Sequence, residues 1–242
     1  MIVLFTDFGL SGPYTGQMKA VLRRDAPLVE VIDLFADAPV GDPYRAAYLL
    51  AAYAMWFPVG TIFLGVVDPG VGSERAPVVV EADGRWFVGP ENGLFELVMR
   101  RAAVASTYEI LWRPEALSMS FHGRDVFAPV AAMLAQGQTP DHRERAGLRR
   151  PDWPDDLDEI VYIDHYGNAI TGMRAGTIPP DATLKIPGHT VTAAATFSAV
   201  PPGKPFWYEN SNGLIEIAIN RGRADAALNL GIGSPITIMV KG

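Results

Sequence analysis

The sequence contains no cysteine, which excludes disulfide bonds, thiolate metal sites and cysteine nucleophiles. Positive charge is also scarce, because the 242 residues include 20 Lys and Arg against 27 Asp and Glu, a formal net charge of −7. A general nucleic-acid binder needs a broad cationic surface, so we expect no nucleic-acid partner. The basic cluster at residues 142–150 lies among Pro, Asp and Gln, and we interpret it as a solvated linker surface.

Long hydrophobic runs are absent too, since no apolar stretch approaches the ~20 residues of a membrane-spanning helix. We therefore expect no membrane partner. The chain opens on the strand-like sequence IVLFTDFG, without the basic segment and cleavage site of a secretory signal, and we expect a cytoplasmic protein. The sequence does have 49% hydrophobic and 19% charged residues, the balance of a compact folded protein.

Strands and helices alternate in the first part of the chain. Apolar and β-branched runs predict strands, and apolar residues at helical spacing predict helices. The predicted strands are residues 2–5, 29–34 and 61–67, and the predicted helices are 14–24 and 44–57. This alternation is typical of parallel pairing with right-handed crossovers, so we expect residues 1–150 to form a doubly wound α/β domain. Residues 77–89 add a hairpin with its turn at Asp83 and Gly84.

The composition changes between residues 138 and 158, where three prolines stand among mixed charges with little apolar periodicity. We place the domain boundary there, with residues 151–158 as the linker. Beyond it, residues 159–242 contain short β segments separated by Gly and Pro. Regularly spaced short strands indicate an all-β sandwich or barrel.

Polar residues follow the predicted strands of the first domain. Asp7 and Asp68 each stand at a strand end shortly before a glycine. Open α/β sheets bind their ligands outside the carboxyl ends of the strands, so both are candidate site residues. Arg75 could fold back toward Asp68, although a tight turn with a surface ion pair is an equally good interpretation. His122 and Asp125 flank the start of a further predicted helix, where a lone histidine is more often structural than catalytic.

Two polar turns mark the second domain. Residues 164–168 read DHYGN and residues 209–213 read ENSNG. Asx-rich turns of this kind are often purely structural. The aromatic residues Tyr166, Trp207 and Tyr208 nevertheless make the two turns suitable for binding a planar base and a ribose.

Six motifs occur in an order that resembles a single family. They are TDFG at 6–9, DPGVG at 68–72, GPENGL at 89–94, FHGRD at 121–125, DHYGN at 164–168 and NSNG at 210–213. The chain resembles the S-adenosylmethionine (SAM) hydrolases, also called SAM hydroxide adenosyltransferases, which are relatives of the fluorinating and chlorinating SAM enzymes. Each motif alone is weak, but six in order along nearly the whole chain make a specific signal.

The resemblance implies a fold, an assembly and a reaction. A doubly wound N-terminal α/β domain would precede a C-terminal β-barrel domain, here residues 159–242. The active sites of a homotrimer would lie between the N-terminal domain of one subunit and the C-terminal domain of the next. The reaction would be hydrolysis of SAM to adenosine and L-methionine by attack of an activated water or hydroxide on C5′ of the ribose, without a metal or other cofactor.

The resemblance also implies roles for individual residues. The substrate would be held by Asp7 at the ribose hydroxyls, Asp164 and Ser211 at the methionine amino and carboxylate groups, Asn168 and Tyr166 at the adenine, and Asn212 as a further binding residue. The water-activating set would be Asp68, Arg75 and His122. Holding the nucleophile in line behind C5′ can lower the barrier by roughly 7–11 kcal/mol. Which of Asp68 and His122 takes the proton stays open.

One distinction within the resembling family concerns the nucleophile. The fluorinating branch carries an inserted loop after the stretch that matches residues 68–75, whereas this chain continues directly into the strand predicted at 77–81. We therefore expect water rather than chloride or fluoride. Two residues depart from the family pattern. Glu91 stands where aspartate is common, which we expect to affect loop packing only, and Gly172 replaces an asparagine, which removes an amide expected near the nucleotide pocket.

Other classes of function stay open. Asp7, Asp68, His122 and Asp125 could gather as a hard-metal site for phosphoester hydrolysis, against the metal-free chemistry that the resemblance implies. A non-catalytic SAM or adenosine sensor would have the same pocket without turnover. A SAM-dependent enzyme that uses chloride is the remaining alternative.

Overall fold

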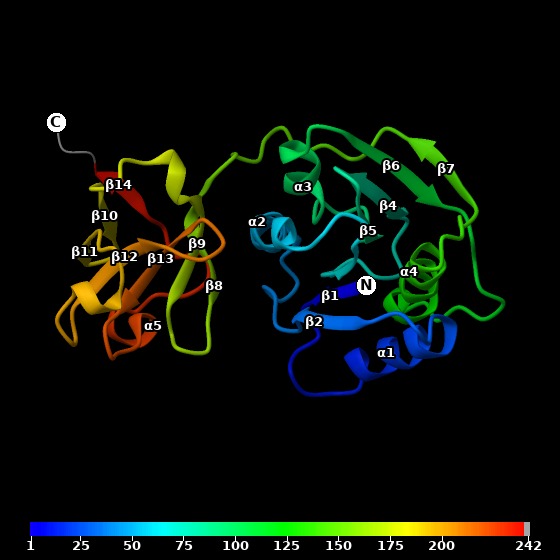
Figure 1. The fold of residues 1–242 in the computed structure, drawn as a ribbon, viewed down its shortest axis with the longest axis horizontal. Coiled ribbons are helices and arrows are strands. Elements are labelled where there is room, and N and C mark those ends of the chain that lie inside the picture. Colours follow the sequence, from blue (N-terminus) through cyan, green and yellow to red (C-terminus); the bar gives the residue numbers. More distant parts are fainter. Residues whose placement is uncertain (240–242) are drawn as a thin grey trace. The chain divides into compact units, whose positions relative to one another are not determined.

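The computed structural model describes residues 1–239, and the chain divides into two compact units between Pro151 and Asp152 (Figure 1). The predicted linker 151–158 lies across this division, and a strand begins within it at Leu157. Residues 240–242 of the second predicted domain lie outside the described residues. Among the described residues, no helix combines the length and the apolar character that crossing a bilayer requires.

The first unit contains a seven-stranded mixed sheet with the order β2-β1-β3-β5-β4-β6-β7. Its strands are β1 (Ile2–Thr6), β2 (Val31–Phe35), β3 (Ile62–Val66), β4 (Pro77–Ala82), β5 (Arg85–Pro90), β6 (Ala105–Ile110) and β7 (His142–Arg145). Strand β1 pairs in parallel with β2 and β3, which confirms the predicted parallel pairing. Strand β5 continues the parallel part, whereas β4, β6 and β7 pair antiparallel.

Helices cover both faces of this sheet, α1 and α4 on one face and α2 and α3 on the other (Figure 1). Their bounds are α1 (Tyr14–Asp25), α2 (Pro43–Tyr53), α3 (Glu96–Arg101) and α4 (Ala128–Ala135). Successive side chains of each strand point to opposite faces of the sheet, so each strand packs against both layers of helices. Ile62 and Leu64 pack in one core cluster with α1 and α4, while Phe63 stacks on Phe87 at 4.9 Å between ring centroids.

Local sequence explains how α2 begins and how β4 and β5 are joined. Asp42 caps α2 by accepting a hydrogen bond from the Arg45 N–H at 3.0 Å, and Pro43 fits the first helical position because its missing N–H needs no partner there. Strands β4 and β5 form the predicted hairpin. Its turn residues Asp83 and Gly84 have φ of 47° and 74°, the two positive values of a tight two-residue turn that matches strand twist.

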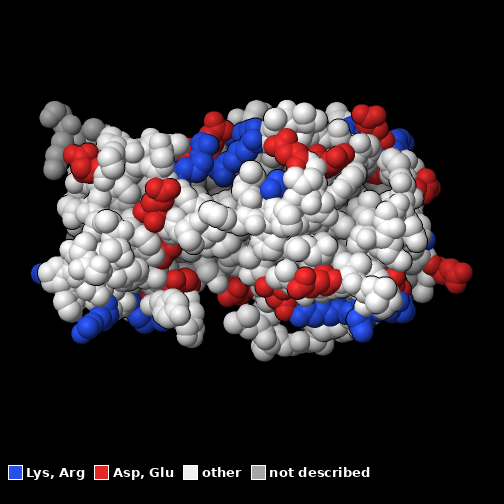
Figure 2. Space-filling view, viewed as in Figure 1, with Lys and Arg blue, Asp and Glu red and all other residues white. Residues whose placement is uncertain are grey.

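The interpretation of residues 142–150 as a solvated linker was wrong for its first part, which forms the edge strand β7 beside β6. Arg143 pairs with Glu109 at 2.7 Å, and Arg145 pairs with Glu91 at 3.0 Å. Figure 2 shows such basic and acidic side chains lying next to each other on one face of the molecule. A charged edge strand has no apolar alternation, so hydrophobic periodicity does not detect it.

The second unit contains two sheets, with strand orders β12-β13-β9-β8 and β11-β10-β14. Its elements are β8 (Leu157–Ile163), β9 (Ala169–Arg174), β10 (Thr183–Ile186), β11 (His189–Thr192), β12 (Pro205–Glu209), β13 (Leu214–Ile219), β14 (Thr237–Met239) and the short helix α5 (Ala224–Ala227). The sheets enclose a shared apolar core that includes Ile160, Leu184 and Ile217.

A closed barrel is not confirmed for this unit. Within residues 152–239 the two sheets meet at isolated bridges, Ala193 with Trp207 and Glu159 with Pro235, and a few neighbouring backbone hydrogen bonds accompany each bridge. Single bridges do not continue a strand ladder, so both sheets remain open. Short strands separated by turns predict an all-β core, but not whether its edges pair.

Candidate active site

Asp68 and Arg75 form a buried, bidentate ion pair just beyond the end of β3. The Arg75 Nε donates to Asp68 Oδ1 at 2.6 Å, and Nη2 donates to Oδ2. The side chains are only 9% and 5% exposed, so the pair is not the surface ion pair of the alternative interpretation. Because removing two charges from water is unfavourable, a pair kept here needs the favourable fork geometry that it has.

The third nitrogen of the Arg75 guanidinium takes no part in the ion pair. Arg75 Nη1 is buried and has no hydrogen-bond partner among the described residues. The guanidinium carbon lies 5.8 Å from the centroid of the Phe127 ring, which covers it on one side. An unpaired buried donor is unfavourable, and a native structure retains it most readily where a ligand or water completes the bond.

The loop that carries Asp68 is held against the segment that carries His122. Gly72 has φ of 83°, and a Cβ atom placed there would lie 2.8 Å from the backbone oxygen of Met119. Only glycine permits this close approach without strain. On the other side, Asn92 Nδ2 donates to the Val67 carbonyl at 2.8 Å, so the GPENGL motif fixes the end of β3.

His122 immediately precedes a π-helical turn, Gly123–Phe127, that leads into α4. Its Nε2 is buried and has no partner among the described residues. Burial lowers the pKa of His122 below its usual 6.5, and the charge of Arg75 lowers it further, while Asp68 and Asp125 act in the opposite direction. The imidazole is therefore neutral near pH 7 and offers a nitrogen that can accept a proton.

Asp7 completes the group at the carboxyl ends of the first unit's parallel strands. It follows β1 and accepts a hydrogen bond from the Gly41 N–H at 2.8 Å. Burial raises the pKa of Asp7, and the nearby charge of Asp68 adds to the rise. The first unit thus brings Asp7, Asp68, Arg75 and His122 into one neighbourhood. Arg113, whose charge also lowers the pKa of His122, has no sequence signal of its own.

In the second unit, Asp164 and Asn168 close the turn between β8 and β9. Asp164 accepts from the Asn168 backbone N–H at 2.8 Å and from its Nδ2 at 3.0 Å. Tyr166, at the tip of the same turn, is 75% exposed and contacts the His165 ring. A large exposed aromatic on a well-braced turn is available to stack on a planar group.

Ser211 and Asn212 lie in the turn between β12 and β13. Asn212 Nδ2 donates to Ser211 Oγ at 3.3 Å, and Asn210 Oδ1 holds the turn by accepting from the Asn212 N–H at 2.9 Å. No hydrogen bond between described residues joins Ser211 or Asn212 to Asp164. Prediction from sequence missed the buried Glu216, which accepts hydrogen bonds from the Tyr208 hydroxyl and from Asn210 Nδ2 at 3.0 Å. A carboxylate within the otherwise apolar strand LIEIAI was the available signal.

The described residues contain no group of three or more His, Asp or Glu side chains arranged to hold a metal ion. Asp7, Asp68, His122 and Asp125 therefore do not form the metal site considered from the sequence. Asp125 instead accepts from the Ser118 N–H at 2.9 Å and pairs with Arg124 at 2.6 Å.

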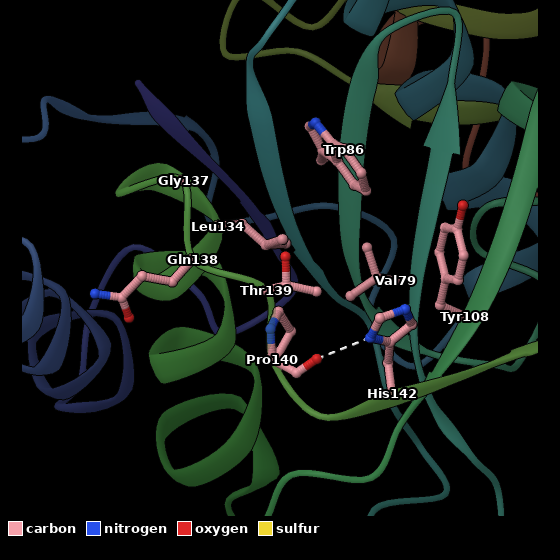
Figure 3. Close-up of a pocket in the computed structure, with 9 residues that line it drawn as sticks. All are labelled: Val79, Trp86, Tyr108, Leu134, Gly137, Gln138, Thr139, Pro140 and His142. Carbon is pink, nitrogen blue, oxygen red and sulfur yellow. Dashed lines mark hydrogen bonds between the residues drawn. The ribbon is translucent and has the colours of Figure 1, made fainter.

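A separate cavity of about 420 Å³ lies at the opposite ends of the parallel strands. Trp86, which lines it, pairs with Ile62 at the start of β3, whereas Asp68 follows the end of that strand. Figure 3 shows the Trp86, Tyr108 and His142 rings around this cavity, with His142 bonded to the Pro140 oxygen. None of the candidate site residues lines it.

The two units match two domains of one family. The model of the SAM hydroxide adenosyltransferase N-terminal domain matches residues 2–144, and the model of the C-terminal domain matches residues 158–237. The chain belongs to the SAM hydroxide adenosyltransferase family.

Relatives and solved structures extend this match. The (R)-S-adenosyl-L-methionine hydrolase of Thermus thermophilus is 39% identical, over 98% of this chain and 99% of that protein. The crystal structure of an uncharacterized conserved protein from Thermotoga maritima has a TM-score of 0.89 at 30% identity and covers 99% of this chain and 100% of its own. A fluorinase from Actinopolyspora mzabensis is 23% identical, over 98% of this chain and 96% of that protein.

Within the SAM hydroxide adenosyltransferase pattern, both departures have a structural account. Glu91 accepts from the Leu148 N–H at 3.0 Å and pairs with Arg145, so it holds a loop, as expected. Gly172 contradicts the expectation of a missing pocket amide. A Cβ atom at this position would lie 2.7 Å from Leu157 Cβ and 3.2 Å from Val161, so the space is filled by apolar side chains.

Proposed function

We propose that this protein hydrolyses SAM to adenosine and L-methionine. The observation that carries the proposal is the buried Asp68–Arg75 pair beside His122, whose Nε2 has no partner, in a chain of the SAM hydroxide adenosyltransferase family. The name (R)-S-adenosyl-L-methionine hydrolase, which the Thermus thermophilus relative carries, supports the same reaction.

The reaction is a displacement at C5′ of the ribose. The water oxygen forms a bond to C5′ while the C5′–S bond breaks. The electron pair of the broken C5′–S bond goes to sulfur, which becomes the neutral thioether of methionine. The water loses one proton. Because the sulfonium leaves without protonation, the step needs no acid and, in this proposal, no cofactor. The protein has to hold a desolvated oxygen in line behind C5′.

The geometry supports a division of roles between the three residues. Both carboxylate oxygens of Asp68 are engaged by Arg75, while His122 keeps a free, buried nitrogen. We assign the proton to His122 Nε2. Asp68 holds Arg75 in place, and the unpaired Nη1 of Arg75 stabilises the hydroxide character that develops on the water.

Substrate binding would draw on both units. Asp7, placed beside Asp68, suits the ribose hydroxyls, and the Asp164 and Ser211 turns suit the amino and carboxylate groups of methionine. Asn168 and Tyr166 would contact the adenine, with Asn212 at the edge of the Ser211 turn. The homotrimer, with each site completed by a neighbouring subunit, and the cytoplasmic location remain part of this proposal.

The test is incubation of the purified protein with SAM, with and without chloride, followed by quantification of nucleosides and methionine. Adenosine and methionine in equal amounts, independent of chloride, are the expected products. A 5′-chloro nucleoside would identify the halide-using alternative, and bound but unchanged SAM would identify a sensor. His189→Ala, a substitution at an exposed position on β11, serves as a control that keeps full turnover.

A further inference from the structure

One corner of the first unit's sheet is not covered by a helix. Val79, Trp86 and Tyr108 lie on the sheet face that packs against α1 and α4. Helix α4 is only eight residues long, ends at Ala135 and makes its main sheet contacts with β1 and β3. The cavity that Trp86 lines lies in this corner, and its volume of about 420 Å³ is in the range of small-molecule sites.

The segment that follows α4 forms a fixed wall of this cavity. Gly137 has φ of 73°, its N–H donates to the Leu134 carbonyl at 3.0 Å, and the Gln138 N–H donates to the Met133 carbonyl at 2.9 Å. This is the Schellman arrangement, which ends a helix and turns the chain. Figure 3 shows this segment on one side of the cavity and the strands on the other. The space is therefore a walled pocket rather than a flat surface.

The lining of the cavity is aromatic and uncharged. Trp86, Tyr108 and His142 contribute their rings, and none of the nine lining residues is Lys, Arg, Asp or Glu. Strand β7 has the sequence HRER, yet only His142 of this strand lines the cavity. A charged ligand would lose its hydration here without gaining an opposite charge, whereas a planar aromatic ligand can pack against the rings.

His142 provides one directed hydrogen-bonding group. Its Nδ1 lies 2.9 Å from the Pro140 carbonyl oxygen, and because a carbonyl only accepts, Nδ1 carries the hydrogen. In the neutral imidazole, Nε2 is then an acceptor. No described residue donates to Nε2, and Figure 3 shows it turned away from Pro140, on the side of Val79 and Tyr108. The matching group on a ligand is an N–H donor.

We propose that this cavity is a second binding site, which takes an uncharged, planar heteroaromatic compound with an N–H donor, of the chemical class of the indoles. The ligand packs against the rings of Trp86 and Tyr108 and donates to His142 Nε2. This inference does not depend on the proposed function, because none of its observations involves Asp68, Arg75 or His122.

The test measures the binding of indole and of benzofuran by calorimetry at pH 8, in the wild type and in His142→Phe. Benzofuran has the shape of indole but an oxygen in place of the N–H. We expect the wild type to prefer indole by roughly three- to tenfold, the value of one hydrogen bond. His142→Phe keeps a ring but offers no acceptor, so the preference should disappear. His189→Ala, at an exposed position in the second unit, is the control that should keep it.

A second variant covers the case in which His142→Phe does not fold. Trp86→Leu removes a ring without removing the acceptor, so it should weaken the binding of indole and benzofuran by the same factor. Benzoate, which is planar but charged, should not bind the wild type. Either an indole affinity that neither variant changes or the absence of indole binding at millimolar concentration overturns the inference. Benzoate binding as tight as that of indole overturns the assigned ligand class.

None of these outcomes bears on SAM hydrolysis.

Discussion

In the proposed reaction His122 takes the proton, because its Nε2 is a buried nitrogen without a hydrogen-bond partner among the described residues. We expect His122→Ala to lower kcat by about 10²–10⁴-fold, the usual contribution of a general base, with little change in SAM affinity.

The wild-type rate should rise with pH through a midpoint below 6.5, because burial and Arg75 lower the pKa of His122 and only the neutral ring accepts a proton. The measurements are kcat and SAM affinity of His122→Ala and a pH–rate profile of the wild type, with His189→Ala as the control variant. A midpoint above 6.5 contradicts the assigned role.

The Asp68–Arg75 pair allows stability and catalysis to be separated. Asp68→Asn leaves the Arg75 guanidinium buried without its counter-charge, which we expect to reduce the free energy of unfolding by about 3–5 kcal/mol. The double variant Asp68→Asn/Arg75→Met removes the stranded charge and should regain most of that stability, but no activity. Denaturant unfolding and turnover are measured on both. A double variant that is stable and active removes the pair from the mechanism.

At the scale of elements, the site depends on two loops packed through glycine. Gly72→Ala places a methyl group 2.8 Å from the Met119 oxygen, so we expect it to displace the His122 segment and lower kcat. Gly60 is the matched control, because its φ of 85° is nearly that of Gly72 (83°) but open space surrounds it. Both alanines should reduce the free energy of unfolding by about 1–2 kcal/mol. Equal kcat values for the two variants contradict the role of the loop contact.

Part of the site was predictable from sequence because its signals are local. Asp7 and Asp68 follow apolar runs, and strands that pair in parallel place such residues at one edge of the sheet. The edge strand β7, the π-helical turn before α4 and the Glu216 contacts arise from tertiary packing. No periodicity marks them, because their residues are charged or alternate irregularly. The open sheets of the second unit depend likewise on which edges meet.

At the scale of the whole molecule, the candidate residues divide between two units, with the proposed water-activating group in the first and the Asp164 and Ser211 turns in the second. If each site combines units of neighbouring subunits, inactive His122→Ala and Asp164→Ala chains should complement each other when co-expressed, because some mixed sites contain neither substitution. Sedimentation should show a trimer. An active monomer, or a mixture no more active than its components, contradicts the shared site.

In the proposed reaction, water attacks C5′ of SAM. The most direct measurement is turnover in isotopically labelled water, followed by mass spectrometry of the nucleoside and of methionine. We expect adenosine with the label at its 5′ oxygen and unlabelled methionine. Label in the amino-acid product, or a nucleoside that retains sulfur at C5′, would place the attack at another carbon and contradict it.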